Sequence, residues 1–75
     1  RFSDMRKWVV QNLDKDPSSL FTSIYDILYK NLQPQSVPAA VLTIADYQYK
    51  SAFVADHEIN MVACLTQIMA ECKFK

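Results

Sequence analysis

Glycine is absent from all 75 residues of this chain, and this absence restricts its architecture more than any other feature. Tight hairpin turns favour glycine strongly, and the loops that cradle phosphates or dinucleotides need it for close backbone approach. Such loops are therefore excluded from this segment. Because 51% of the residues are apolar, the chain can bury a core. We expect one small all-α domain over residues 1–75, a bundle of about four helices joined by short links.

The charge balance does not favour nucleic-acid binding. Eight basic and eight acidic residues cancel, whereas nucleic-acid binders usually carry a basic surplus or a clustered basic face. The tightest basic pair is Arg6-Lys7, and these side chains fit a solvated surface at a helix end. No run approaches the ~20 apolar residues of a membrane span, and no signal-peptide layout opens the chain. The start, Arg-Phe-Ser-Asp, lacks an initiator Met, so we expect a fragment of a longer protein.

No residue pattern predicts a catalytic, cofactor-binding or metal site. Cys64 and Cys72 are eight residues apart, which on one helix is a rise of roughly 12 Å. This distance is too long for a disulfide bond between them, so we expect two buried, reduced thiols of a cytosolic protein. His57 lies between Asp56 and Glu58, but adjacent helix positions do not face one another. No second convergent group completes an acid–base or metal cluster. The serines likewise have no base partner.

Apolar periodicity and capping residues predict where the helices begin and end. The first helix is expected to start at the N-cap Ser3 and the second at Asp16-Pro17, where a capping acid precedes a proline. Ser36 is the expected cap of the third helix and Asp56 of the last. The expected links are 12–16, 31–36 and 53–56.

The stretch from Val37 to Met61 is expected to lie at the centre of the bundle. Its third helix carries apolar residues along two lines. One line consists of Val37, Val41, Ile44 and Gln48, and the other of Leu42, Ala45, Tyr49 and Phe53. A helix that is apolar on two sides is expected to be packed on two sides.

The same stretch carries a resemblance to a known family. The run Ile44-Ala45-Asp46-Tyr47-Gln48-Tyr49-Lys50, then Ala55, then Ile59-Asn60-Met61-Val62-Ala63 is similar to the C-terminal domain of sliding-clamp-loader small subunits. These belong to the AAA+ replication factor C family, and the resemblance is to the clamp loaders of T4-like bacteriophages. It covers the last half of the chain well and the first half only by helix order. Val54 stands at the family's turn glycine, so the turn must take another geometry or carry strain.

The resemblance implies an oligomerisation function in DNA replication. Clamp loaders are rings of five subunits whose C-terminal domains form a closed collar, while ATP, Mg and primer–template DNA are bound by the N-terminal domains. This segment would then be a collar domain with no ATP site of its own, part of a cytoplasmic ATPase that acts on a sliding clamp. For a phage protein the compartment would be the cytoplasm of the bacterial host. The alternative is a stand-alone helical adaptor that offers a groove to a partner helix. An enzyme is the least favoured class.

Aromatic residues are the expected contacts with neighbouring subunits, since they are enriched in interfaces. Trp8 shares a face with Met5 and Val9, which favours core packing over an exposed partner contact. Tyr25 and Tyr29 are four residues apart and fit either a core edge or a partner surface. The candidate subunit-interface residues are Trp8, Tyr25, Tyr29, Tyr47, Tyr49 and Phe74.

Overall fold

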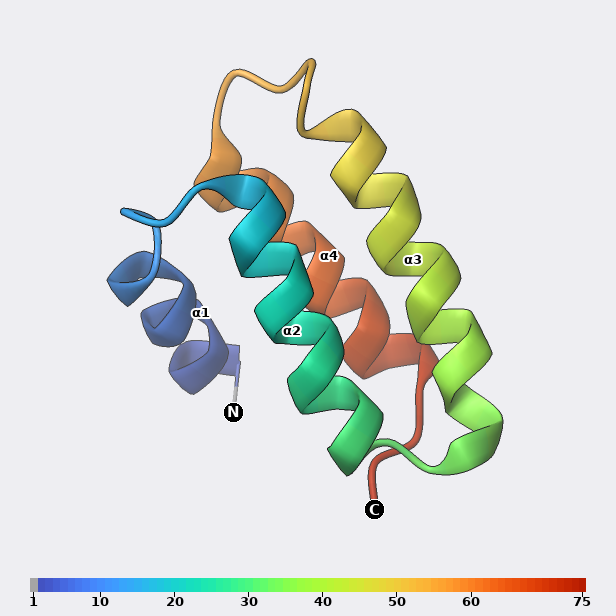
Figure 1. The fold of residues 1–75 in the computed structure, drawn as a ribbon. Helices are drawn as coiled ribbons and strands as arrows, with labels where there is room; N and C mark the ends of the chain where they lie inside the picture. The colour runs from blue at the N-terminus through green and yellow to red at the C-terminus, as the bar shows by residue number, and fades with distance from the viewer. Residues whose placement is uncertain (1) are drawn as a thin grey trace.

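The computed structural model describes residues 2–75 and is a bundle of four α-helices (Figure 1). The helices are α1 (Phe2–Gln11), α2 (Pro17–Asn31), α3 (Val37–Lys50) and α4 (His57–Glu71), and a short 3-10 helix, η1 (Pro34–Ser36), precedes α3. Apart from one isolated bridge, residues 2–75 contain no β structure. The predicted all-α fold with four helices is confirmed.

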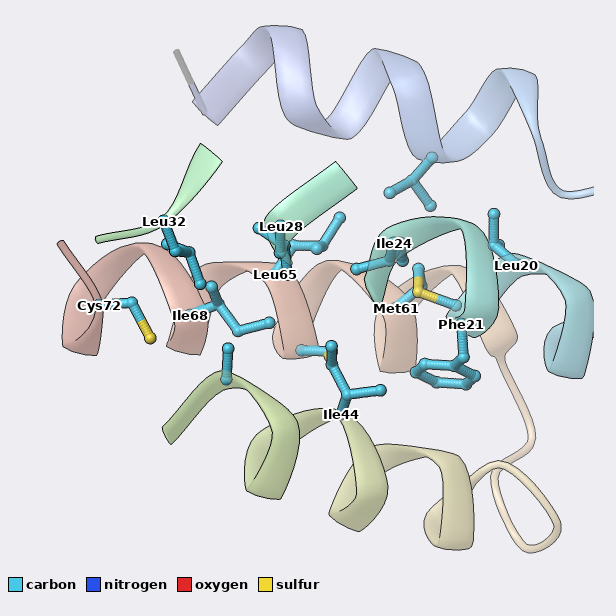
Figure 2. Close-up of a cluster of buried hydrophobic side chains, with 13 residues drawn as sticks. Leu20, Phe21, Ile24, Leu28, Leu32, Ile44, Met61, Leu65, Ile68 and Cys72 are labelled. Atoms are coloured by element: carbon cyan, nitrogen blue, oxygen red, sulfur yellow. The ribbon is translucent and has the colours of Figure 1, made fainter. Parts of the chain in front are cut away.

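The helices enclose one apolar core. Helix α1 packs against α4, and α3 packs against both α2 and α4. Helices α1 and α3 therefore lie on opposite sides of the pair α2 and α4, as both views show (Figures 1 and 2). Figure 2 shows the buried side chains between the helices. The core residues are Val9, Leu20, Phe21, Ile24, Leu28, Leu32, Ala40, Ile44, Met61, Cys64, Leu65, Ile68 and Cys72.

Two of the four predicted helix caps, Asp16 and Asp56, are confirmed, and the other two, Ser3 and Ser36, are wrong. The Ser19 backbone N–H donates to Asp16 Oδ1 at 2.9 Å, and the Ile59 N–H donates to Asp56 Oδ1 at 3.1 Å. The bonds from Ser19 also hold the pKa of the Asp16 carboxyl below its ordinary value. Ser3 is not an N-cap, because α1 already includes Phe2 and a cap residue must have non-helical backbone angles.

Ser36 does not cap α3 either. Its backbone angles are φ −92° and ψ −14°, because η1 continues directly into α3 and leaves no extended cap residue. Its hydroxyl instead accepts a hydrogen bond from the Lys73 backbone N–H at 2.9 Å. Its carbonyl accepts a bond from the Cys72 thiol at 3.7 Å. Ser36 therefore fixes the C-terminal tail against the link between α2 and α3.

The tail also pairs with the end of α2. Leu32 and Phe74 form the isolated antiparallel bridge. The Gln33 N–H donates to the Lys73 carbonyl at 2.9 Å, and the Lys75 N–H donates to the Asn31 carbonyl at 2.8 Å. These bonds hold residues 73–75 along the 31–33 segment.

We expect Ser36→Ala to lower the free energy of unfolding by about 1–2 kcal/mol, because the Lys73 N–H loses its acceptor at a buried hydroxyl. Urea unfolding followed by circular dichroism measures this loss. The matched control is Ser51→Ala, since the Ser51 hydroxyl donates to the Gln48 carbonyl at an exposed site. Its expected effect is within about 0.5 kcal/mol. Equal unfolding midpoints for the two variants would contradict a role for the Ser36 hydroxyl in holding the tail.

The expected central position of the third helix is wrong. In α3 only Ala40, Thr43 and Ile44 are buried, whereas α4 buries five residues and contacts both α1 and α3. The second apolar line of α3 faces away from the core. The two apolar lines correctly indicate that α3 has two apolar sides, but the other helices of the bundle cover only one of them.

The link between α3 and α4 settles the question that Val54 raised. No residue among 2–75 has a positive φ angle. The link therefore takes a geometry that does not require glycine, and no left-handed strain falls on Val54.

Candidate interaction surfaces

A row of exposed apolar residues runs along α3 and into the turn that follows it, and we name it the outer ridge: Leu42, Ala45, Tyr49 and Phe53. Leu42, Ala45 and Tyr49 recur at steps of three and four, so they share one face of α3, whereas Phe53 lies in the turn that follows the helix. Leu42, Tyr49 and Phe53 are 72%, 71% and 73% exposed. The rings of Tyr49 and Phe53 are 5.3 Å apart, centroid to centroid, and tilted by 56°. The outer ridge is therefore an exposed apolar row in which the Tyr49 and Phe53 rings are in contact.

One edge of the outer ridge carries an ion pair whose two charges cancel. Lys50 Nζ lies 3.0 Å from Oδ2 of Asp46, which is four residues earlier on the same helix, and 4.8 Å from the centroid of the Tyr47 ring. The hydrogen bond to Asp46, together with its charge, raises the pKa of the Lys50 ammonium. A partner that covers the ridge therefore meets no net charge from this pair.

A second apolar surface lies between α1 and α2, and we name it the α1–α2 groove. It consists of two adjoining hollows of about 430 and 230 Å³ that share Met5, Leu28 and Leu65. Trp8, Ile24 and Ile27 complete the smaller hollow, while Ile68, Met69 and Phe74 complete the larger one. Every lining residue is apolar, and Ile27 is 47% exposed.

The six aromatic residues predicted at the interface lie on different surfaces. Tyr49 belongs to the outer ridge, while Trp8 and Phe74 line the α1–α2 groove at half-buried positions. Tyr25 and Tyr29 form an exposed ring pair on α2 with centroids 6.0 Å apart. Tyr47 is half-buried against the core. The structure therefore does not bring all six together, and their contact with a partner stays a prediction.

Several residues of these surfaces were not among the six. Leu42 and Phe53 flank Tyr49 on the outer ridge, and Ile27 and Met69 line the groove. For the ridge, the signal was present in the sequence as the second apolar line of the third helix. For the groove there was no local signal, because its walls come from segments that are distant in sequence.

Among residues 2–75, the structure brings together no group of three His, Cys, Asp or Glu side chains that could hold a metal ion. Asp56, beside His57, is engaged as a helix cap, and the Ser19 hydroxyl donates to Asp16 at 3.0 Å. Over the same residues, no helix has the length and apolar character needed to cross a membrane.

No protein-family model matches the chain, and no curated protein matches it. The resemblance to clamp-loader collars therefore depends on the motif residues 44–50, 55 and 59–63 alone. What the structure adds is the class of fold, a small four-helix domain, and the position of its two uncovered apolar surfaces.

Proposed function

We propose that this chain is an oligomerisation domain that holds protein subunits together through the outer ridge of α3. The observation that carries the proposal is the row formed by Leu42, Tyr49 and Phe53, each about seven-tenths exposed. Single exposed apolar side chains are common on soluble proteins and need no explanation. A contiguous apolar patch marks a site of interaction far more often.

In its more specific form, the proposal is a collar domain of a sliding-clamp-loader small subunit. It is supported by the motif resemblance, by the neutral charge and by a helical bundle with apolar residues on more than one side. The ATPase activity, the Mg and nucleotide sites, and the contacts with the sliding clamp and DNA would then belong to other domains of a longer AAA+ protein. Cytoplasmic location, in the bacterial host for a phage protein, and a ring of five subunits are parts of the same proposal.

A second candidate function is a helical adaptor, and the α1–α2 groove favours it. An amphipathic helix binds in a groove through apolar side chains at helical spacing. The methionines Met5 and Met69 in the lining suit such a partner, since their flexible side chains adapt to different shapes.

Sedimentation velocity over a wide concentration range tests the oligomerisation proposal. We expect concentration-dependent assembly of the wild-type chain, and we expect Leu42→Asp to weaken it by about tenfold or more, because a charge would be buried in the contact. Thr66→Asp is the matched control, since Thr66 is exposed on α4 and lies on neither apolar surface. A wild-type chain that stays monomeric at every concentration would overturn oligomerisation by this domain alone.

A further inference from the structure

We propose that residues 72–75 form a strap that opens and closes while the four-helix core stays folded, and that its opening removes one wall of the α1–α2 groove. The strap begins at Cys72, where the chain leaves α4 with extended backbone angles of φ −113° and ψ 150°. It then runs beside the link between α2 and α3 (Figure 1). This conformational device does not depend on the proposed self-association.

Five hydrogen bonds join the strap to residues 31–36. The Lys73 N–H donates to the Ser36 hydroxyl and the Lys73 carbonyl accepts from the Gln33 N–H, both at 2.9 Å. The Lys75 N–H donates to the Asn31 carbonyl at 2.8 Å, and the Gln33 side-chain amide donates to the Phe74 carbonyl at 3.3 Å. The fifth bond runs from the Cys72 thiol to the Ser36 carbonyl at 3.7 Å. These bonds can break as one group while the hydrogen bonds inside the helices remain.

The strap presents alternate side chains to the bundle and to solvent, as an extended segment does. Lys73 and Lys75 are exposed, whereas Cys72 is buried and Phe74 is half-buried. Phe74 lines the larger hollow of the groove, together with Ile68 and Met69 of α4. Opening of the strap therefore takes Phe74 out of this wall and uncovers the Cys72 thiol.

The strap is held less firmly than the core. It places one buried and one half-buried side chain against the bundle, whereas α4 alone buries five residues. The free energies of local opening in a folded protein range from near zero to that of global unfolding, and segments with few buried apolar contacts lie at the low end. The strap should therefore open far more often than the core unfolds.

The two cysteines report the two kinds of opening separately. In a Cys64→Ala chain, Cys72 should react with a thiol reagent through strap opening, and in a Cys72→Ala chain, Cys64 should react only when the core unfolds. At pH 8 in buffer, we expect Cys72 to be labelled at least about tenfold faster than Cys64. Low concentrations of urea should speed the labelling of Cys64 steeply and that of Cys72 little, because the urea dependence of an opening scales with the surface that it exposes.

Two variants of the Cys64→Ala chain test what holds the strap closed. Ser36→Ala removes the acceptor of the Lys73 N–H and should speed the labelling of Cys72 by about 5–30-fold. Phe74→Ala removes the side chain from the hollow and should speed it by about tenfold. Lys75→Ala is the matched control, since the Lys75 side chain is exposed and its backbone bond to Asn31 is kept. The control should change the rate by less than about twofold.

A core variant distinguishes strap opening from global unfolding. Leu20 is 2% exposed and lies at the end of α2 opposite Asn31. Leu20→Ala should speed the labelling of Cys64 by at least about 30-fold and leave that of Cys72 within about twofold. Equal acceleration of both thiols would mean that the strap opens only with the core, and it would overturn the inference.

The remaining outcomes are also decisive. If Phe74→Ala leaves the Cys72 rate unchanged, Phe74 does not hold the strap in the hollow and the proposed link to the groove is wrong. If Leu20→Ala does not fold, the urea series on the two single-cysteine chains takes its place. Parallel urea dependences of Cys64 and Cys72 labelling would contradict a separate opening of the strap.

Discussion

Replacing Phe21 by alanine should lower the free energy of unfolding by about 3–5 kcal/mol. The Phe21 ring is only 2% exposed and lies in the core where α2 faces α3 (Figure 2). Truncation removes this buried apolar surface and leaves a cavity that the surrounding helices fill only in part. A 75-residue domain has a total stability of about 4–11 kcal/mol, so the variant should be close to unfolding at room temperature. Urea and thermal unfolding followed by circular dichroism measure the effect.

The matched control is the same chemical change at Phe53. This ring is 73% exposed on the outer ridge, so Phe53→Ala should change the free energy of unfolding by less than about 1 kcal/mol. It should nevertheless weaken self-association. If Phe53→Ala destabilises the fold as much as Phe21→Ala, then the ridge packs within its own chain and is not a free surface.

The Cys64 thiol should react very slowly in the folded protein. Burial raises its pKa to about 12 from an ordinary value of 9.0, with a smaller contribution from the charge of Asp46. At pH 8 the thiolate fraction is then lower by about 1,000-fold, and the thiolate is the reactive form. Burial also raises the pKa of Cys72. In a Cys72→Ala chain, labelling of Cys64 with a thiol reagent at pH 8 should therefore be at least about 100-fold slower in buffer than in urea, and rapid labelling of that folded variant would contradict this prediction.

The same shift predicts a loss of stability at alkaline pH. Because the folded pKa of Cys64 lies above the unfolded value, its contribution is fully present below pH 9 and is lost as the pH rises toward 12. Cys64→Ala should have a flatter dependence of unfolding free energy on pH between these values. Cys72→Ala serves as the control, since it leaves Cys64 in place. If the wild-type and Cys64→Ala chains lose stability in parallel over this interval, ionisation of Cys64 is not responsible.

Local signals in the sequence were enough to predict the helices and two of their caps. Asp16 and Asp56 each bind a backbone N–H only three residues ahead, so the information for the cap lies within one turn. The number of helices followed in the same way from apolar periodicity and from the prolines. These features do not depend on distant parts of the chain.

Interactions between distant segments were not predictable in this way. The partner of the Ser36 hydroxyl is a backbone N–H 37 residues away, so nothing near Ser36 indicated that it would hold the tail instead of capping a helix. The groove likewise depends on how α1 sits against α2 and α4. Periodicity grouped Leu42 and Tyr49 on one face of α3 correctly, but it gave no information on whether another helix of the same chain would cover that face.

No residue among 2–75 has a positive φ angle, so the turns of this domain do not need glycine. The absence of glycine lowers the conformational entropy of the unfolded chain. A chain without glycine has fewer conformations available when unfolded, and each replacement of a glycine by alanine at a compatible site is worth about 0.4–1 kcal/mol. The backbone angles of the links do not require glycine, so at exposed link positions a substitution meets no conformational barrier from a positive φ. The exposed positions of the links can therefore vary in sequence while the backbone is preserved, whereas Leu32 and Ser36 are constrained by burial.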